Sequence, residues 1–492
     1  MIARFESPIA ALDHLHSIGY LYPDATQGMQ YDLVSAWKPV EGGAIKQTSL
    51  CGVNCTTEKG QYTCPSAITM NAGASKTTFA PASFIVAKAL IVEQGLDLVR
   101  HKFARDDVYD FCQRSEIKST AMVEALVMSF LNRRTEFNCF GGDSEQHPEV
   151  VQIIRTLKTH GMKINLTATG LRWVNDPEYP DELLADPPQV ICVSYDAPSL
   201  DEFRRYADMS LADIRAEIRA LDRSPTEEWR HGQLKKALAS IFVARYLSSQ
   251  SSKGLPCGLL FNTVLHPGNI RDIDQITKEV EAAFPGSIVN PYPGQSAFDN
   301  TFQDPGEEYL VYLERFVDRA IEKTLSGKRF VKRLHYWLML KAAFVVYRDD
   351  REALKRAMSG YGVWTCFEEP MAGFYVQPSR SPIPKQPLIQ LTGKSVRPDN
   401  VPAIPGGYLG CFWNPFTVTE NDQQITSPQQ VYDHIMQNMM NLAARAKQED
   451  PDHACGGSIM PRLGFNGVTT EKGMNQRLRP TYRELRRQYA GF

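Results

Sequence analysis

Segments in which apolar residues recur at every second position, as in strands, alternate along this chain with segments in which they recur at helical spacing. Residues 44–50 (AIKQTSL) form a short β-favouring segment behind two glycines, which predicts a strand that ends at Cys51. Helical spacing follows in 81–103, with Pro81 near a permitted first-turn position, and in 119–134, where Ser119 is a candidate cap. The chain therefore begins its regular part with a strand and two helices.

The same exchange of periods continues to about residue 292. A short apolar run, 136–140, ends in Gly141, Gly142 and Asp143, and a helical pattern follows. The remaining predicted elements, in chain order, are a helix at 147–161, strands at 163–170, 189–197 and 258–265, a helix at 270–284 and a strand at 287–292. Strands that alternate with helices predict parallel βαβ units and an α/β fold.

Polar residues recur where these strands end. Ligand sites of parallel sheets form at the carboxyl ends of the strands, on the loops that lead into the helices. Any one of these residues is equally well explained as a turn or capping residue, but their recurrence at successive strands predicts a site. The candidates are Gly141, Gly142, Asp143, Thr169, Gly170, Ser194, Asp196 and Asn262.

The amino-acid composition is that of an ordinary globular protein. The 492 residues are 43% apolar and 22% charged, which is enough for a large core and more than one domain. The 54 basic and 56 acidic residues give a formal charge of −2, so no overall field attracts nucleic acid or an anionic membrane. Nucleic acid is therefore not an expected partner.

The chain shows no export or membrane signal. Arg4, Glu6 and Asp13 interrupt the N-terminal segment, and the longest uncharged run, 400–419, is broken by several prolines and glycines. We therefore expect a cytoplasmic protein without a membrane partner, in which the ten cysteines are reduced. Close cysteine spacing then favours metal or redox chemistry over disulfides.

Cys51, Cys55 and Cys64 form the most specific cysteine pattern, C-x3-C-x8-C. They are open to three interpretations: the complete protein ligand set of a group that needs exactly three ligands, half of a structural zinc site, or structural thiols without a metal. A closed zinc site needs four ligands, and the next thiol in the sequence is the distant Cys112.

Residues 140–170 (FGGDSEQHPEVVQIIRTLKTHGMKINLTATG) resemble the second half of the core of radical S-adenosylmethionine enzymes. The shared features are a Gly-Gly-Glu-like motif, a His-Pro pair, a helix and a Thr-x-Gly-type strand end. "CVSYDAPS" and "GLLFNTVLHPGNIRDIDQI" resemble the fourth and fifth strands of that family. The resemblance covers about 44–300 and implies a partial (β/α)6 TIM-like barrel, with an N-terminal extension at 1–43 and a further region at 301–492.

The resemblance implies the chemistry as well. Cys51, Cys55 and Cys64 would hold a [4Fe-4S] cluster by three irons, and the fourth iron would be left for the amino and carboxylate groups of S-adenosyl-L-methionine. An electron from a donor such as flavodoxin or ferredoxin would cleave the sulfonium. The resulting 5'-deoxyadenosyl radical would abstract hydrogen from a small-molecule or peptide substrate, in a biosynthetic or modification step.

The family's cofactor contacts carry over by position. Gly141, Gly142 and Asp143 would meet the methionyl amino group, and the Asp143 carboxylate would pair with this cation. Thr169, Ser194 and Asn262 would contact the methionyl carboxylate, the ribose or the adenine, and Tyr62 would cover the adenine side.

Two features depart from the family pattern. The usual spacing is C-x3-C-x2-C, whereas eight residues separate Cys55 from Cys64. Asp143 stands where the family has glutamate, which keeps the charge on a shorter side chain.

The region 301–492 is expected to cap the barrel and to shape a substrate pocket. It begins with helical patterns and becomes rich in aromatic residues, proline and glycine after about residue 361. Cys366, Cys411 and Cys455 lie too far apart to predict an auxiliary cluster, and three other cysteines within strand-like runs are expected in the core: Cys139, Cys192 and Cys257. The alternative function is a non-catalytic zinc or iron–sulfur scaffold protein with the same barrel.

Overall fold

The computed structural model describes residues 143–195, 199–223, 228–250, 254–293, 306–326 and 334–351, together with short strands and scattered helical positions elsewhere. The chain divides into two compact units. One unit comprises Met1–Gln30, Phe84–Phe137 and Arg333–Phe492, and the other comprises Tyr31–Ser83 and Asn138–Lys332. The second unit contains most of the described residues and the strand ends at which a site is predicted.

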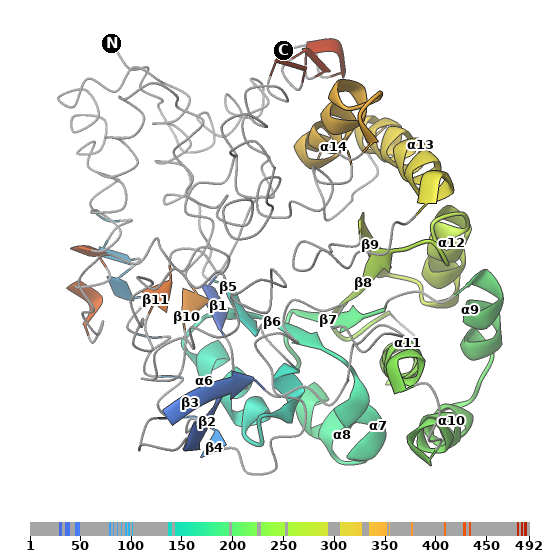
Figure 1. The fold of residues 1–492 in the computed structure, drawn as a ribbon. Helices are drawn as coiled ribbons and strands as arrows, with labels where there is room; N and C mark the ends of the chain where they lie inside the picture. Colours follow the sequence, from blue (N-terminus) through green and yellow to red (C-terminus); the bar gives the residue numbers. More distant parts are fainter. Residues whose placement is uncertain are drawn as a thin grey trace. The chain divides into compact units, whose positions relative to one another are not determined.

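Four parallel strands form the centre of the second unit (Figure 1). They are β6 (Lys163–Ala168), β7 (Val190–Ser194), β8 (Gly258–Leu265) and β9 (Ser287–Pro293), paired in this order. A short strand, β5 (Glu136–Cys139), is the neighbour of β6. The predicted α/β fold with parallel strands is therefore confirmed.

One face of this sheet carries the core. Successive strand residues point to opposite faces, and the burial pattern alternates accordingly on β6, β7 and β8. The fully buried positions lie on one face and include Leu166, Ile191, Val193, Phe261 and Val289. The other face is only half-buried over β6 to β8. A sheet with one fully buried and one half-buried face can cover the first with helices and present the second to other groups.

Helices from the connections between the strands contact the sheet: α6 touches β6, α11 touches β7 and α12 touches β9. Their apolar stripes supply the buried partners of the core, among them Ile154, Phe242 and Ile276. The helices of this unit are α6 (Val150–Thr159), α7 (Leu171–Asn175), α8 (Tyr179–Leu184), α9 (Leu200–Ala207), α10 (Leu211–Arg223), α11 (Glu228–Gln250), α12 (Ile273–Ala283) and α13 (Gly306–Leu325). A 3-10 turn, η1 (Ser144–Gln146), precedes α6.

The strand predicted at 44–50 exists, but its expected place in the parallel sheet is wrong. It is β3 (Ile45–Ser49), which pairs antiparallel with β2 (Ser35–Pro39) in a separate sheet completed by β4 (Thr78–Phe79). The five residues 40–44 that join β2 to β3 include Gly42 and Gly43. So short a connection permits only a hairpin, because parallel neighbours need a crossover of a dozen residues or more.

The other unit is described over a smaller part of its length. Helix α14 (Leu334–Val346) buries Trp337, Leu338 and Leu340. Two short strands, β10 (Tyr375–Val376) and β11 (Tyr408–Leu409), pair antiparallel, and β1 is Met29–Tyr31. Helical positions between 82 and 101 agree with the helix predicted at 81–103, whereas the helix predicted at 119–134 lies outside the described residues. Within the described part of the chain, no helix is both long and apolar enough to cross a bilayer.

Candidate functional site

Strand register brings three of the predicted polar residues into one row. Ser194 on β7 pairs with Asn262 on β8, and Asn262 pairs with Asn290 on β9. Ala168 on β6 pairs with Val193, so Thr169 continues this row at the end of β6. Because directly paired residues project to the same face of a sheet, Ser194, Asn262 and Asn290 lie on the face opposite the core. Ser194 and Asn262 are half-buried there, whereas Asn290 is buried.

The row contains one residue that sequence reasoning missed, Asn290. Its side-chain Nδ2 donates a hydrogen bond of 2.8 Å to Oδ1 of Asn262. Asn290 is 6% exposed, and its own Oδ1 has no hydrogen-bond partner among the residues that the structure describes. The signal in the sequence was an asparagine inside the short strand 287–292, but only the register shows that it lies beside Asn262.

Cys192 shares this face with the row and is half-buried, so its expected place in the apolar core is wrong. The reason is strand alternation: its neighbours Ile191 and Val193 point to the core, and Cys192 points the other way. Cys257, which precedes β8, is also only half-buried. Burial raises the pKa of its thiol to about 11, which makes it a poor source of thiolate for a metal.

Asp143 and Thr169, predicted separately at two strand ends, are joined by hydrogen bonds. The Thr169 hydroxyl donates to Asp143 Oδ2 at 2.6 Å, and its backbone N–H donates to Oδ1 at 3.3 Å. Gln146 donates its side-chain Nε2 to Oδ2 at 3.1 Å. Asp143 is fully buried, and the ends of two neighbouring strands therefore meet at its carboxylate.

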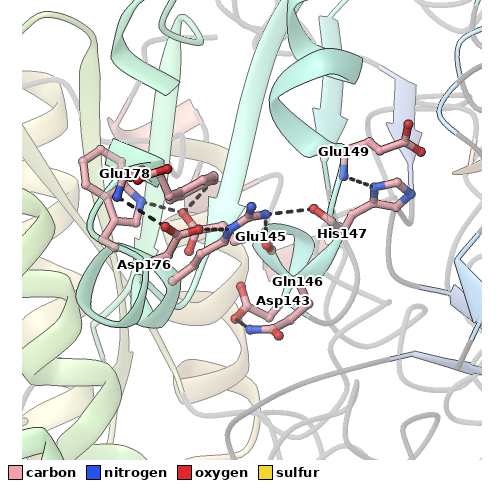
Figure 2. A network of polar contacts seen from close by, with 10 residues as sticks. Asp143, Glu145, Gln146, His147, Glu149, Asp176 and Glu178 are labelled. Carbon is pink, nitrogen blue, oxygen red and sulfur yellow. Dashed lines mark hydrogen bonds and ion pairs between the residues drawn. The ribbon is translucent and has the colours of Figure 1, made fainter. Parts of the chain in front are cut away.

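Beside Asp143 lies a buried carboxyl that sequence reasoning did not single out, Glu145 (Figure 2). It accepts hydrogen bonds from three groups: Nε1 of Trp173 at 2.6 Å, the hydroxyl of Tyr179 at 3.3 Å and the backbone N–H of Gly170 at 3.2 Å. The signal was weak, because a glutamate in a polar turn before a helix ordinarily reads as solvent-exposed.

The environment of Glu145 favours its protonated form. Burial, and then the charge of nearby Asp143, raise the pKa of Glu145 to about 8, although its three hydrogen bonds act in the opposite direction. Burial and the charge of Glu145 likewise raise the pKa of Tyr179. The Glu145 carboxyl therefore keeps its proton to a higher pH than an exposed glutamate does, because its pKa is raised.

Arg172 lies beside this cluster and binds backbone carbonyls through Nη1 and the Asp176 carboxylate through Nε. Its Nη1 donates to the backbone oxygens of Glu145 and His147, both at 2.9 Å. Its guanidinium lies 4.3 Å from the centre of the Tyr179 ring. Arg172 thus fastens the segment 145–147 to helix α7.

The turn after β6 depends on a glycine. Gly170 has φ of 79°, in the left-handed region, and a Cβ there would come within 2.9 Å of the backbone oxygen of Ala239 on α11. The close approach fixes the turn against the helix that also contacts β7.

The other predicted site residues lie outside the described residues. These are Cys51, Cys55, Cys64, Tyr62, Gly141, Gly142 and Asp196. Among the residues that the structure does describe, no group of three or more histidine, cysteine or acidic side chains is arranged to hold a metal ion.

Chemically, the described part of the site offers a row of neutral hydroxyl and amide groups next to a buried carboxylate. A scan against models of protein families finds none that matches this chain. A search of curated proteins finds no match either. The function therefore has to be argued from the residues themselves.

Proposed function

We propose that this protein is a radical S-adenosylmethionine enzyme with a [4Fe-4S] cluster. The proposal rests on the C-x3-C-x8-C pattern of Cys51, Cys55 and Cys64 and on the family-like segment 140–170. One structural observation supports it most: Thr169, Ser194 and Asn262 continue one row at a parallel sheet, next to Asp143. Parallel sheets bind ligands at the carboxyl ends of their strands.

The finer form of the fold belongs to the same proposal. Four parallel strands with helices against one face are what part of a (β/α)6 barrel would contain, and its interior would be the face that carries the polar row. The residues 301–492 would then cap the open side and complete a substrate pocket.

The charge at Asp143 fits the proposed cofactor. Asp143 is fully buried, yet it forms no ion pair with any described cationic side chain. A carboxylate offers about four lone-pair sites, and three are used by Thr169 and Gln146. An unpaired buried charge is costly, so a cationic ligand group such as the methionyl ammonium would be stabilised there.

The neutral residues of the row have complementary roles. Hydroxyl and amide groups donate to a carboxylate and exchange hydrogen bonds with ribose hydroxyls or an adenine edge without adding charge. Thr169, Ser194 and Asn262 would supply these contacts.

The cluster and S-adenosylmethionine, when bound, would supply one-electron cleavage of the sulfonium and hydrogen abstraction from a small-molecule or peptide substrate. A flavodoxin or ferredoxin would supply the electron. The protein's own residues bind and orient these groups and keep water away from them.

Anaerobic reconstitution with iron and sulfide tests the proposal. The wild-type chain should gain about four irons, the content of one cluster, and should release 5'-deoxyadenosine from S-adenosylmethionine after addition of dithionite. A variant with Cys51, Cys55 and Cys64 all replaced by alanine is the control and should do neither. A chain that binds zinc or a cluster but never cleaves S-adenosylmethionine would instead be the metal-binding scaffold protein.

A further inference from the structure

Two carboxyl groups hold the turn after β6 by consecutive backbone amides. Asp143 accepts the N–H of Thr169, and Glu145 accepts the N–H of Gly170 at 3.2 Å. Both carboxyls come from the single short segment that follows β5. The ends of β5 and β6 are therefore tied together at two adjacent peptide groups.

Glu145 is itself held rigidly. Its Oε1 accepts from Trp173 and Tyr179, whose rings meet edge to face with centroids 6.1 Å apart. Arg172 adds hydrogen bonds to the backbone on either side of Gln146. Movement of the Glu145 side chain would break contacts to α7 and α8 simultaneously.

We infer that Glu145 is a positioning residue, which fixes the Asp143 carboxylate and the Thr169 hydroxyl for ligand binding by clamping the turn at Gly170. The side chain of Glu145 is fully buried and its hydrogen bonds all go to protein groups, so it acts through its neighbours and does not touch the ligand. This inference rests on the proposed function, because the ligand whose binding is measured is S-adenosylmethionine.

Two substitutions distinguish an effect on the turn at Gly170 from a general loss of stability. Glu145→Gln keeps the size of the side chain and one oxygen for Trp173 and Tyr179, but its amide N–H2 then faces the N–H of Gly170, and two donors cannot bond. Tyr179→Phe removes a different hydrogen bond of the same carboxyl and leaves the Gly170 contact in place. Each variant therefore loses one hydrogen bond of the residue 145 side chain, but only Glu145→Gln loses the bond to the N–H of Gly170 that holds the turn.

The experiment measures S-adenosylmethionine affinity by equilibrium dialysis of the reconstituted full-length protein, without reductant. Glu145→Gln should raise Kd about tenfold, the equivalent of one hydrogen bond, whereas Tyr179→Phe should stay within about twofold. Because Glu145 acts through Asp143, Glu145→Gln should add little to the effect of Asp143→Asn in a double variant. Hydrogen–deuterium exchange of peptides that cover 167–172 should rise in Glu145→Gln and not in Tyr179→Phe.

The outcomes are distinguishable. If the wild type binds S-adenosylmethionine and Glu145→Gln binds it equally well, or if the effects of Glu145→Gln and Asp143→Asn simply add, the positioning role is wrong and the proposed function stands. If the wild type does not bind S-adenosylmethionine, the proposed function fails. Hydrogen–deuterium exchange at 167–172 then tests by itself whether Glu145 holds the turn. Unchanged exchange in Glu145→Gln would show that it does not.

Discussion

The hydroxyl of Thr169 lies 2.6 Å from Oδ2 of Asp143, although 26 positions separate the two residues in the sequence. The same hydroxyl accepts the N–H of Leu171 at 3.3 Å, so its direction is set from both sides. A residue at the end of β6 thereby orients a carboxylate that follows β5. This contact ties together the two predicted strand-end motifs.

Replacement of Cys51, Cys55 or Cys64 by alanine should abolish the visible absorption of the cluster and all cleavage of S-adenosylmethionine, because the proposed cluster is held by all three thiolates. Absorption spectra after anaerobic reconstitution check this. Cys257→Ala is the matched control and should keep both properties, since the pKa of that thiol is raised to about 11. Equal damage from Cys112→Ala would instead favour a four-ligand zinc site.

Asp143→Asn should leave the iron content unchanged and weaken S-adenosylmethionine binding. Loss of a charge-assisted hydrogen bond costs about 1–3 kcal/mol, which raises Kd roughly 5- to 150-fold. Equilibrium dialysis measures the change, and Asp208→Asn on the exposed end of α9 is the control for lost charge. Unchanged affinity in Asp143→Asn would remove Asp143 from the cofactor site.

The free energy of unfolding should fall as pH rises from about 4.5 to about 8, because Glu145 binds a proton more tightly in the folded protein than in the unfolded chain. Its folded-state pKa of about 8 lies above the ordinary value of 4.5, so the folded protein holds a proton that the unfolded chain has released. This contribution is fully present below about pH 4.5 and declines toward pH 8, by at most about 1.4 kcal/mol for each pH unit. Urea unfolding of wild type and Glu145→Gln at pH 6 to 9 isolates it, and parallel pH profiles of the two proteins would contradict the assignment.

Gly170→Ala should destabilise the protein more than Gly161→Ala does. Both glycines have φ of 79°, so both alanines pay roughly 1–2 kcal/mol for the left-handed conformation. Only at Gly170 does the added Cβ meet backbone, 2.9 Å from the oxygen of Ala239, whereas nothing lies within 4 Å at Gly161. The difference between the two unfolding midpoints in urea therefore reports the cost of the clash between the added Cβ and α11. Equal midpoints would show that α11 moves to accommodate the Cβ.

Thr263→Val should stabilise the protein by about 1 kcal/mol. The Thr263 side chain is fully buried on the core face of β8, and within the described part of the chain its hydroxyl has no hydrogen-bond partner. An apolar group of the same shape therefore removes an uncompensated desolvation cost. Thr169→Val is the opposite case, because its hydroxyl is bonded to Asp143, and it should destabilise. Thermal unfolding of the two variants checks that the signs differ.

Local patterns in the sequence determined which helices and strands form around the parallel sheet of the second unit. The periods of apolar residues predicted β6, β7, β8 and β9 and the helices α6 and α12, because burial of one face follows directly from the order of side chains along the chain. The same patterns placed Thr169, Ser194 and Asn262 at or near strand ends, where a parallel sheet exposes polar groups to ligands.

Contacts between distant segments decided the rest. Register, which depends on how strands pair across the sheet, brought Asn290 beside Asn262. The hairpin of β2 and β3 kept β3 out of the parallel sheet. The buried state of Glu145 arises from Trp173 and Tyr179, which lie 28 and 34 positions away along the chain. Burial among such partners is the largest cause of the raised pKa of Glu145, and no local pattern of residues encodes that exclusion of water.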